Sequence, residues 1–185
     1  WNLSGLFHMT HIVNINSIFE YNLLSHNLAH DGNYIQNDIS MLCVNNRRNR
    51  LEPINNKNLH DYVPLYFSIK NPMMYVRKGM SSNIIILKIN NSILNLKKTI
   101  FSDGNAASQS TAFYSNLNQL NDLSWDCLNN NYWNDYSDGK RKKCAEVLVP
   151  DLIEPKMIDE IICSNFITKR ELIDLVPNSF QDKIV

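Results

Sequence analysis

This sequence has little charge, few glycines and no long apolar run. Only 19 % of its 185 residues are charged, and 18 basic residues balance 18 acidic ones. The balance excludes a globally basic protein that coats nucleic acid, although a local basic patch remains compatible with it. No apolar run approaches the roughly 20 residues that a membrane helix needs, and no secretory signal is visible at the start. We therefore expect a cytoplasmic protein without a membrane anchor.

Motifs for several common chemistries are also missing. The four cysteines form no CxxC pair and have no histidine at metal-ligand spacing, which predicts free, reduced thiols. No Walker A, GxGxxG or GxSxG motif occurs, so the usual phosphate loops and the serine-hydrolase elbow are excluded. His8 and His11 would point to opposite faces of a strand, so no metal site is expected there. The cysteines are Cys43, Cys127, Cys144 and Cys163.

The remaining composition favours one folded domain over residues 1–185. Hydrophobic residues make up 44 % of the chain, which supports a core and argues against disorder. Five glycines and six prolines leave no hinge-rich linker between two halves. The first residue is Trp1 rather than Met, so we expect further residues upstream of it in the gene product.

Apolar patterning predicts strands and helices without strict alternation of the two, which is typical of an α+β fold. Strands are expected at 6–12, 62–68, 83–90, 100–102, 144–149 and 157–163. Helices are expected at 15–23 after an N-cap at Asn14, and at 39–49, 71–76, 111–123, 125–133 and 169–176. Polar loops are expected at 25–37, 51–59 and 135–143. Pro64 lacks a backbone N–H, so the strand around it is expected at a sheet edge or to start there.

Three polar strand residues are candidates for a functional site. His8 and Thr10 alternate with apolar residues, so they share one face of their strand. Both side chains can hydrogen-bond an amide or a hydroxyl of a polar ligand. Glu146 lies within an otherwise apolar strand, where a carboxylate is costly to bury without a partner. It is therefore either a solvent-facing residue of an edge strand or a general base beside a cleft.

Basic and aromatic residues give further candidates. The arginines of 47–50 either end a solvated helix or bind an anion, because a guanidinium matches phosphate oxygens at two points. Tyr62 and Tyr66 are either core residues or rings that stack on a flat heteroaromatic ligand. The interval 103–143 is rich in Asn, Ser, Trp and Tyr and ends in a basic cluster. It is either a solvated loop or a guide for single-stranded nucleic acid.

Taken in order, several blocks of this sequence resemble the DarT family of bacterial DNA ADP-ribosyltransferases. The resemblance covers roughly residues 6–163 and depends on six blocks in register rather than on one decisive motif. The blocks are Leu6-Phe7-His8-Met9-Thr10-His11-Ile12; Asn46-Arg47-Arg48-Asn49-Arg50; His60-Asp61-Tyr62-Val63-Pro64-Leu65-Tyr66-Phe67; Phe101-Ser102-Asp103-Gly104-Asn105-Ala106; Trp125 with Trp133; and Ala145-Glu146-Val147-Leu148-Val149.

The resemblance implies an ADP-ribosyltransferase (PARP-like) fold, in which two packed, mostly antiparallel sheets surround an NAD cleft and helices flank them. It implies NAD as co-substrate, no metal, and a base in sequence-specific single-stranded DNA as acceptor. It further implies the toxin of a toxin–antitoxin system. The expected partner is an antitoxin with ADP-ribosyl-hydrolase (macrodomain) activity.

The resemblance also implies roles for individual residues. Glu146 matches the catalytic glutamate, and Arg48 matches the essential arginine near the NAD phosphates and the acceptor. His8 and Thr10 match positions that hold the nicotinamide ribose, and Tyr66 matches a ring that packs against nicotinamide. The loop that recognises the DNA strand matches 103–143, with Asp103, Asn105, Lys140, Arg141 and Lys142 as the expected contacts.

Several alternatives stay open at this point. The family has thymidine-modifying and guanosine-modifying branches, and the Arg-Arg-Asn-Arg and Tyr-Val-Pro blocks favour thymidine. Leu65 departs from the family's pattern, and so does Lys70, which keeps the charge of an arginine without its two-point geometry. The same fold could instead modify protein or RNA, or hydrolyse NAD. A non-catalytic module that binds single-stranded nucleic acid is disfavoured because both Arg48 and Glu146 are present.

Overall fold

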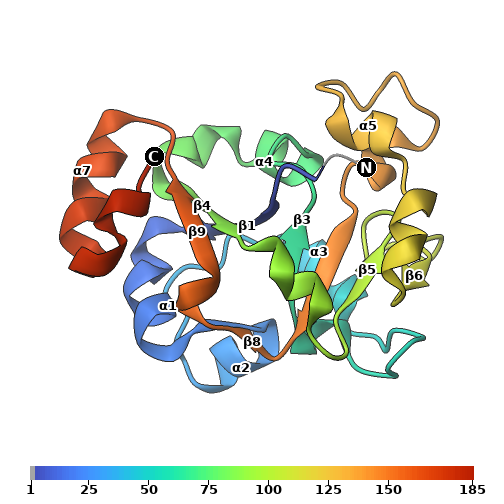
Figure 1. Cartoon of the computed structure of the whole chain (residues 1–185), viewed down its shortest axis with the longest axis horizontal. Helices are drawn as coiled ribbons and strands as arrows, with labels where there is room; N and C mark the ends of the chain where they lie inside the picture. The colour runs from blue at the N-terminus through green and yellow to red at the C-terminus, as the bar shows by residue number, and fades with distance from the viewer. Residues whose placement is uncertain (1–2) are drawn as a thin grey trace.

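The computed structural model describes residues 3–185 and shows an α+β fold built on a long antiparallel sheet (Figure 1). Its strand order is β6-β5-β7-β3-β1-β4-β9, and a second sheet pairs β2 with β8. The strands are β1 (Leu6–His11), β2 (Leu23–Leu24), β3 (Tyr62–Tyr66), β4 (Ile84–Ile89), β5 (Ile100–Ser102), β6 (Phe113–Tyr114), β7 (Glu146–Pro150), β8 (Leu152–Ile153) and β9 (Ile158–Ile162). The α-helices are α1 (Ile15–Tyr21), α2 (His26–Asp31), α3 (Leu42–Arg48), α4 (Pro72–Val76), α5 (Trp125–Asn129), α6 (Gly139–Lys142) and α7 (Phe166–Leu175).

The long sheet consists of two halves that meet at a single residue pair. β1 and β3 are neighbours, yet only Phe7 and Tyr66 face each other as ladder partners. By contrast, β1 pairs with β4, and β3 pairs with β7, along the whole length of these strands. The halves β6-β5-β7-β3 and β1-β4-β9 therefore correspond to the two mostly antiparallel sheets expected from the sequence. Beyond the single pair, β1 and β3 diverge.

Pro64 lies in the middle of an internal strand, so the prediction of an edge strand is wrong. β3 lies between β7 and β1 in the sheet. The Pro64 carbonyl oxygen is 3.0 Å from Nδ1 of His8, which belongs to β1. In an antiparallel strand the N–H and C=O of one residue point to the same side. The missing N–H of Pro64 therefore faces the region where β1 and β3 have no ladder, and no sheet hydrogen bond is lost.

The central strands are buried on both faces. In β4, Ile85 and Leu87 join the main hydrophobic core, whereas Ile84 and Ile86 pack in a second cluster with Phe7. A strand that is covered on both faces needs a continuous apolar run instead of alternation. The predicted strand at 83–90 has such a run, and the prediction is confirmed.

The helices lie outside the sheet and are short (Figure 1). α4 begins at Pro72 as predicted, and the Asn71 side chain caps it by accepting a hydrogen bond from the Met74 N–H at 3.0 Å. α7 has 10 residues and lies near the C-terminus. Within residues 3–185, no helix is both long enough and apolar enough to cross a membrane.

Three local predictions are wrong. The expected loop at 25–37 contains α2, which has no buried residue and therefore gave no apolar periodicity. The helix expected at 111–123 is instead β6 followed by the 3-10 helix Leu117–Asp122, because its first apolar residues pair with β5. The expected loop at 135–143 ends in the four-residue helix α6.

Candidate active site

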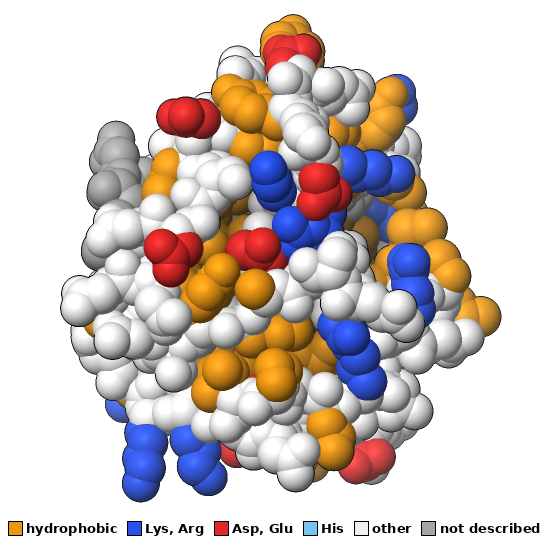
Figure 2. All heavy atoms as spheres, turned by 90° about the vertical axis from the view of Figure 1, so that its right-hand side faces the viewer, with side chains coloured by type: hydrophobic (Ala, Val, Ile, Leu, Met, Phe, Trp, Pro, Cys, Tyr) orange, Lys and Arg blue, Asp and Glu red, His pale blue; other side chains and the backbone are white. Residues whose placement is uncertain are grey.

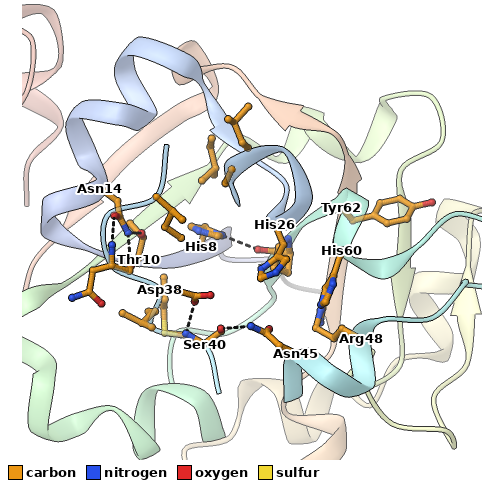
Figure 3. A pocket seen from close by; sticks show the side chains of 18 of the residues that line it. His8, Thr10, Asn14, His26, Asp38, Ser40, Asn45, Arg48, His60 and Tyr62 are labelled. Carbon is orange, nitrogen blue, oxygen red and sulfur yellow. Dashed lines mark hydrogen bonds between the residues drawn. The ribbon is translucent and has the colours of Figure 1, made fainter. Parts of the chain in front are cut away.

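A pocket opens where β1 and β3 diverge (Figure 3). His8 and Thr10 line it from β1, and Pro64 and Tyr66 line it from β3. Residues of α2, α3 and the segment 34–41 complete its wall. The empty space, including the open mouth, is about 1200 Å³. Its lining combines apolar side chains with a few convergent polar groups, which is the usual form of a ligand-binding pocket.

The two polar residues of β1 present one acceptor and one donor to the pocket. The His8 Nδ1 donates to the Pro64 carbonyl oxygen at 3.0 Å. Burial lowers the pKa of His8 below its ordinary value, so the ring is neutral and its Nε2 is an acceptor. The Thr10 Oγ1 accepts from Asn14 Nδ2 at 3.0 Å, which leaves the threonine hydrogen available to a ligand.

Asn14 shapes the pocket wall, whereas the sequence predicts a helix cap at this position. Its side chain makes no capping hydrogen bond to α1. Instead its Oδ1 accepts from the backbone N–H groups of Gln36 and Asn37 at 2.9 and 3.0 Å. Its Nδ2 also donates to the Asn37 carbonyl at 2.8 Å. These bonds hold the segment 34–41 in place beside the pocket.

Arg48 and Glu146 form a buried ion pair at the pocket. Arg48 Nη1 donates to Glu146 Oε2 at 2.8 Å, and the two residues are 9 % and 1 % exposed. Arg48 ends α3 and lines the pocket, and Glu146 begins β7 and reaches the pocket through Arg48. β7 lies between β5 and β3. The structure therefore excludes the solvent-facing alternatives for both residues.

Two polar atoms at this pair have no hydrogen-bond partner among the residues that the structure describes. They are Arg48 Nη2 and His60 Nε2, and both are buried. Burial, followed by the positive charge of Arg48, lowers the pKa of His60, so its ring is neutral. A buried polar atom without a partner costs about 1–3 kcal/mol. The two atoms therefore mark the place where a polar ligand would complete the site.

The loop at 103–111 holds the same glutamate from the other side. The Ala106 N–H donates to Glu146 Oε1 at 3.1 Å. Arg50 Nη2 donates to the carbonyl oxygens of Ala106 and Ser108, each at 2.8 Å. One carboxylate oxygen of Glu146 is thus held from the pocket and the other from the loop. Arg50 therefore fixes this loop, a role that the sequence patterns do not predict.

The residues expected to contact DNA fall into two groups. Asp103 pairs with Arg141 at 2.7 Å, and Asn105 Oδ1 accepts from the Ala107 N–H at 2.9 Å. The polar side chains of Asp103, Asn105 and Arg141 therefore hold the loop in shape. In the second group, on α6, Lys140 is exposed and Lys142 is half-buried. The side of the molecule that carries α5 and β6 shows basic side chains beside exposed apolar ones (Figure 2).

Lys143 is part of the basic cluster in the sequence but not on the surface. It is 1 % exposed, and its Nζ donates to the Asn130 carbonyl at 2.6 Å. Burial lowers its pKa below the ordinary value for lysine. Its contacts with backbone carbonyls at the end of α5 give it a structural role.

The two candidate tyrosines differ in their surroundings. The Tyr62 hydroxyl donates to Glu52 Oε1 at 2.8 Å, and the residue is 1 % exposed, so it is anchored in the core. Tyr66 is half-buried and lines the pocket beside Arg48. Burial and the nearby Glu146 carboxylate raise the pKa of Tyr66 well above its ordinary value. Its hydroxyl therefore stays protonated at neutral pH.

The mouth of the pocket carries a polar group that the sequence patterns do not predict. His26, His30 and Asp38 lie close together there. The four-residue spacing of the two histidines was the available signal, because residues four apart share one face of a helix. The signal was lost because the segment was expected to be a loop.

Comparisons with known proteins agree on one family. A family model described as ssDNA thymidine ADP-ribosyltransferase, DarT, matches residues 7–184. A DNA ADP-ribosyl transferase–DNA ADP-ribosyl glycohydrolase fusion protein of Thermosipho africanus is 30 % identical over an alignment of 172 positions, which covers 86 % of this chain. The match covers 42 % of that protein, so the chain spans less than half of its length.

Two solved structures of one relative have the same fold. The Thermus sp. 2.9 DarT in complex with ADP-ribosylated ssDNA matches with a TM-score of 0.84 and 27 % identity, over 94 % of this chain and 87 % of that one. The same protein in complex with NAD+ matches with a TM-score of 0.80 and 25 % identity, over 95 % and 89 % of the two chains. These superpositions confirm the predicted ADP-ribosyltransferase fold.

Proposed function

Because this chain belongs to the DarT family of ssDNA thymidine ADP-ribosyltransferases, we propose that it transfers ADP-ribose from NAD to a thymidine base in single-stranded DNA. The observation that carries the proposal is the buried pair of Arg48 and Glu146. The pair joins the pocket to the loop at 103–111. Arg48 thus serves the NAD donor, and Glu146 lies between the donor and the DNA acceptor.

The pocket residues suit NAD as the donor. The unpaired Arg48 Nη2 supplies a charged donor for a phosphate oxygen. His8 Nε2 accepts from a ribose hydroxyl, and Thr10 donates to a carbonyl oxygen such as that of the carboxamide. The ring of Tyr66 packs against nicotinamide. A relative was solved in complex with NAD+, which supports NAD as the donor.

Glu146 is the group that activates the acceptor. When the bond between nicotinamide and ribose breaks, nicotinamide departs as a neutral molecule. Positive charge then develops on the ribose. Each carboxylate oxygen of Glu146 already accepts one hydrogen bond and has a second lone pair for an incoming base. Removal of the proton from the base nitrogen by a positioned carboxylate contributes about 10²–10⁴-fold to a rate. A base must be unstacked to be attacked, which favours single strands over duplex DNA.

The loop at 103–111 and α6 form the face for the DNA strand. Asp103, Asn105 and Arg141 keep the loop in the shape that meets the strand, and Lys140 and Lys142 face the phosphates. A relative was solved in complex with ADP-ribosylated ssDNA, which supports single-stranded DNA as the acceptor. Because the chain has no net charge, its affinity for DNA depends on these local contacts.

The biological setting follows from the same family membership. The Thermosipho africanus relative joins a DNA ADP-ribosyl transferase to a DNA ADP-ribosyl glycohydrolase in one chain. We propose that the present chain is a toxin and that a separate or fused ADP-ribosyl hydrolase is its antitoxin. Both would act in the bacterial cytoplasm, where the DNA is, and one domain over 1–185 would carry the donor and acceptor sites.

The proposal is tested by the intact mass of oligonucleotides after incubation with the protein and NAD. The set contains single strands of mixed sequence, the same strands with every thymidine replaced, and matched duplexes. We expect one ADP-ribose to be added to thymidine-containing single strands only. Addition to strands without thymidine would assign the chain to guanosine modification. Release of nicotinamide without any modified strand would instead support NAD hydrolysis or a protein or RNA acceptor.

A further inference from the structure

A cluster of two histidines and one aspartate at the pocket mouth has no role in the proposed transfer. His26 and His30 lie four residues apart on α2, and their ring centroids are 4.1 Å apart. His30 Nε2 is 3.4 Å from Asp38 Oδ2, in the segment 34–41. One nitrogen or oxygen atom from each residue lies within 4.8 Å of the other two.

The spacing of these atoms is close to that of metal ligands. Ligand atoms about 2.0–2.2 Å from a tetrahedral cation lie roughly 3.4 Å from one another. The distance between His30 and Asp38 already has this value. A ring nitrogen of His26 lies within 4.8 Å of both of these atoms. The side chains of His30 and Asp38 are 42 % and 30 % exposed, so a cation can reach the cluster from solvent.

One carboxylate oxygen of Asp38 is free to face the histidines. The Ser40 N–H donates to Oδ1 of Asp38 at 2.7 Å, which leaves Oδ2 to face His30.

We propose that His26, His30 and Asp38 bind a divalent transition-metal cation at the mouth of the pocket. Two imidazoles and one carboxylate favour zinc, nickel or cobalt over magnesium or calcium, which prefer oxygen ligands alone. The cation links α2 to the segment 34–41, and both contribute to the pocket wall. The proposal assigns no step of the transfer to the cation and does not depend on the proposed function.

The test is a calorimetric titration of the whole chain with zinc and, separately, with cobalt. All variants carry Cys43→Ser, because Cys43 is an exposed thiol that could bind either cation. We expect one cation per chain, and we expect His30→Ala and Asp38→Asn each to weaken binding at least tenfold. Asp31→Ala, on the same helix but outside the cluster, is the matched control and should bind as the parent protein does. Circular dichroism confirms that each variant is folded.

Two further readouts, the cobalt spectrum and the melting temperature with zinc, test the same site. Cobalt bound by imidazole and carboxylate absorbs visible light, and this spectrum should disappear in His30→Ala. Zinc should raise the melting temperature of the parent protein by several degrees and leave that of His30→Ala unchanged, because a ligand that binds only the folded state stabilises it. Equal affinity of His30→Ala and Asp31→Ala for zinc, or no saturable binding in the parent protein, would overturn the proposal.

Discussion

Arg48 and Glu146 lie 98 residues apart in the sequence and form a hydrogen-bonded ion pair 2.8 Å long. The second carboxylate oxygen of Glu146 accepts from the Ala106 N–H at 3.1 Å. A single buried glutamate is therefore held by the donor pocket on one side and by the loop at 103–111 on the other. Its position is set by contacts from α3, β7 and this loop together, which explains why no local pattern reveals it.

Arg48→Lys is expected to weaken NAD binding. A lysine ammonium can pair with Glu146, but it cannot also present the second donor that Arg48 Nη2 supplies. Loss of one hydrogen bond to a charged group costs about 1.5–3 kcal/mol, which is roughly ten- to hundredfold in affinity. Calorimetry with NAD measures the change. Arg47→Lys is the control, because Arg47 is exposed and its Nε donates to the Cys43 carbonyl of its own helix. An equal loss in both variants would contradict the role of Arg48.

Gly104→Ala is expected to impair use of the DNA strand without affecting the donor. A Cβ at Gly104 would lie 2.4 Å from Arg141 Nη1, so the guanidinium must move away from Asp103. The loop then loses the ion pair that shapes it, and the KM for the oligonucleotide should rise several-fold while NAD affinity stays the same. Gly79→Ala is the matched control, since a Cβ there has nothing within 4 Å. Steady-state kinetics at varied oligonucleotide concentration measure this KM. Equal KM values for the two variants would refute the expectation.

Stability is expected to fall as the pH drops below about 6.5. Burial lowers the pKa of His8, His26 and His60 in the folded state, so the unfolded chain binds protons first. The folded state therefore loses stability from pH 6.5 downward, and the contribution of His26 continues to about pH 4, where its folded-state pKa lies. Urea unfolding at pH 7 and pH 5 measures the difference. His26→Gln should lose less stability between these two pH values than the parent protein, and an identical loss would contradict the assignment.

The strands that position the site are largely predictable from the sequence. The continuous apolar run of β4 identifies a strand that is buried on both faces. The alternation of polar and apolar residues around His8 and Thr10 identifies β1. The edge position expected from Pro64 is wrong, because a gap in the ladder and the side chain of His8 make a proline tolerable in an internal strand. Nothing local in the sequence signals such a gap.

The site itself is only partly predictable. An isolated Glu146 in an apolar strand indicates that a partner exists, but the sequence does not say which of the three nearby arginines at 47–50 supplies it. In the structure Arg48 pairs with Glu146 at the pocket, whereas Arg50 donates to a backbone carbonyl of the loop at 103–111. The cluster of His26, His30 and Asp38 was missed because α2 buries no residue and so has no apolar period to mark it as a helix.

The central claim is that Glu146 acts on the acceptor and not on the donor. Glu146→Gln tests it most directly, because glutamine keeps the size of the side chain and a carbonyl oxygen for Arg48 but cannot take up a proton. We measure NAD affinity by calorimetry and ADP-ribose transfer to a thymidine-containing single strand by mass spectrometry. The account predicts NAD affinity within about threefold of the parent protein and transfer lower by about 10²–10⁴-fold. Transfer at the parental rate, or a loss of transfer that is matched by an equal loss of NAD affinity, would contradict it.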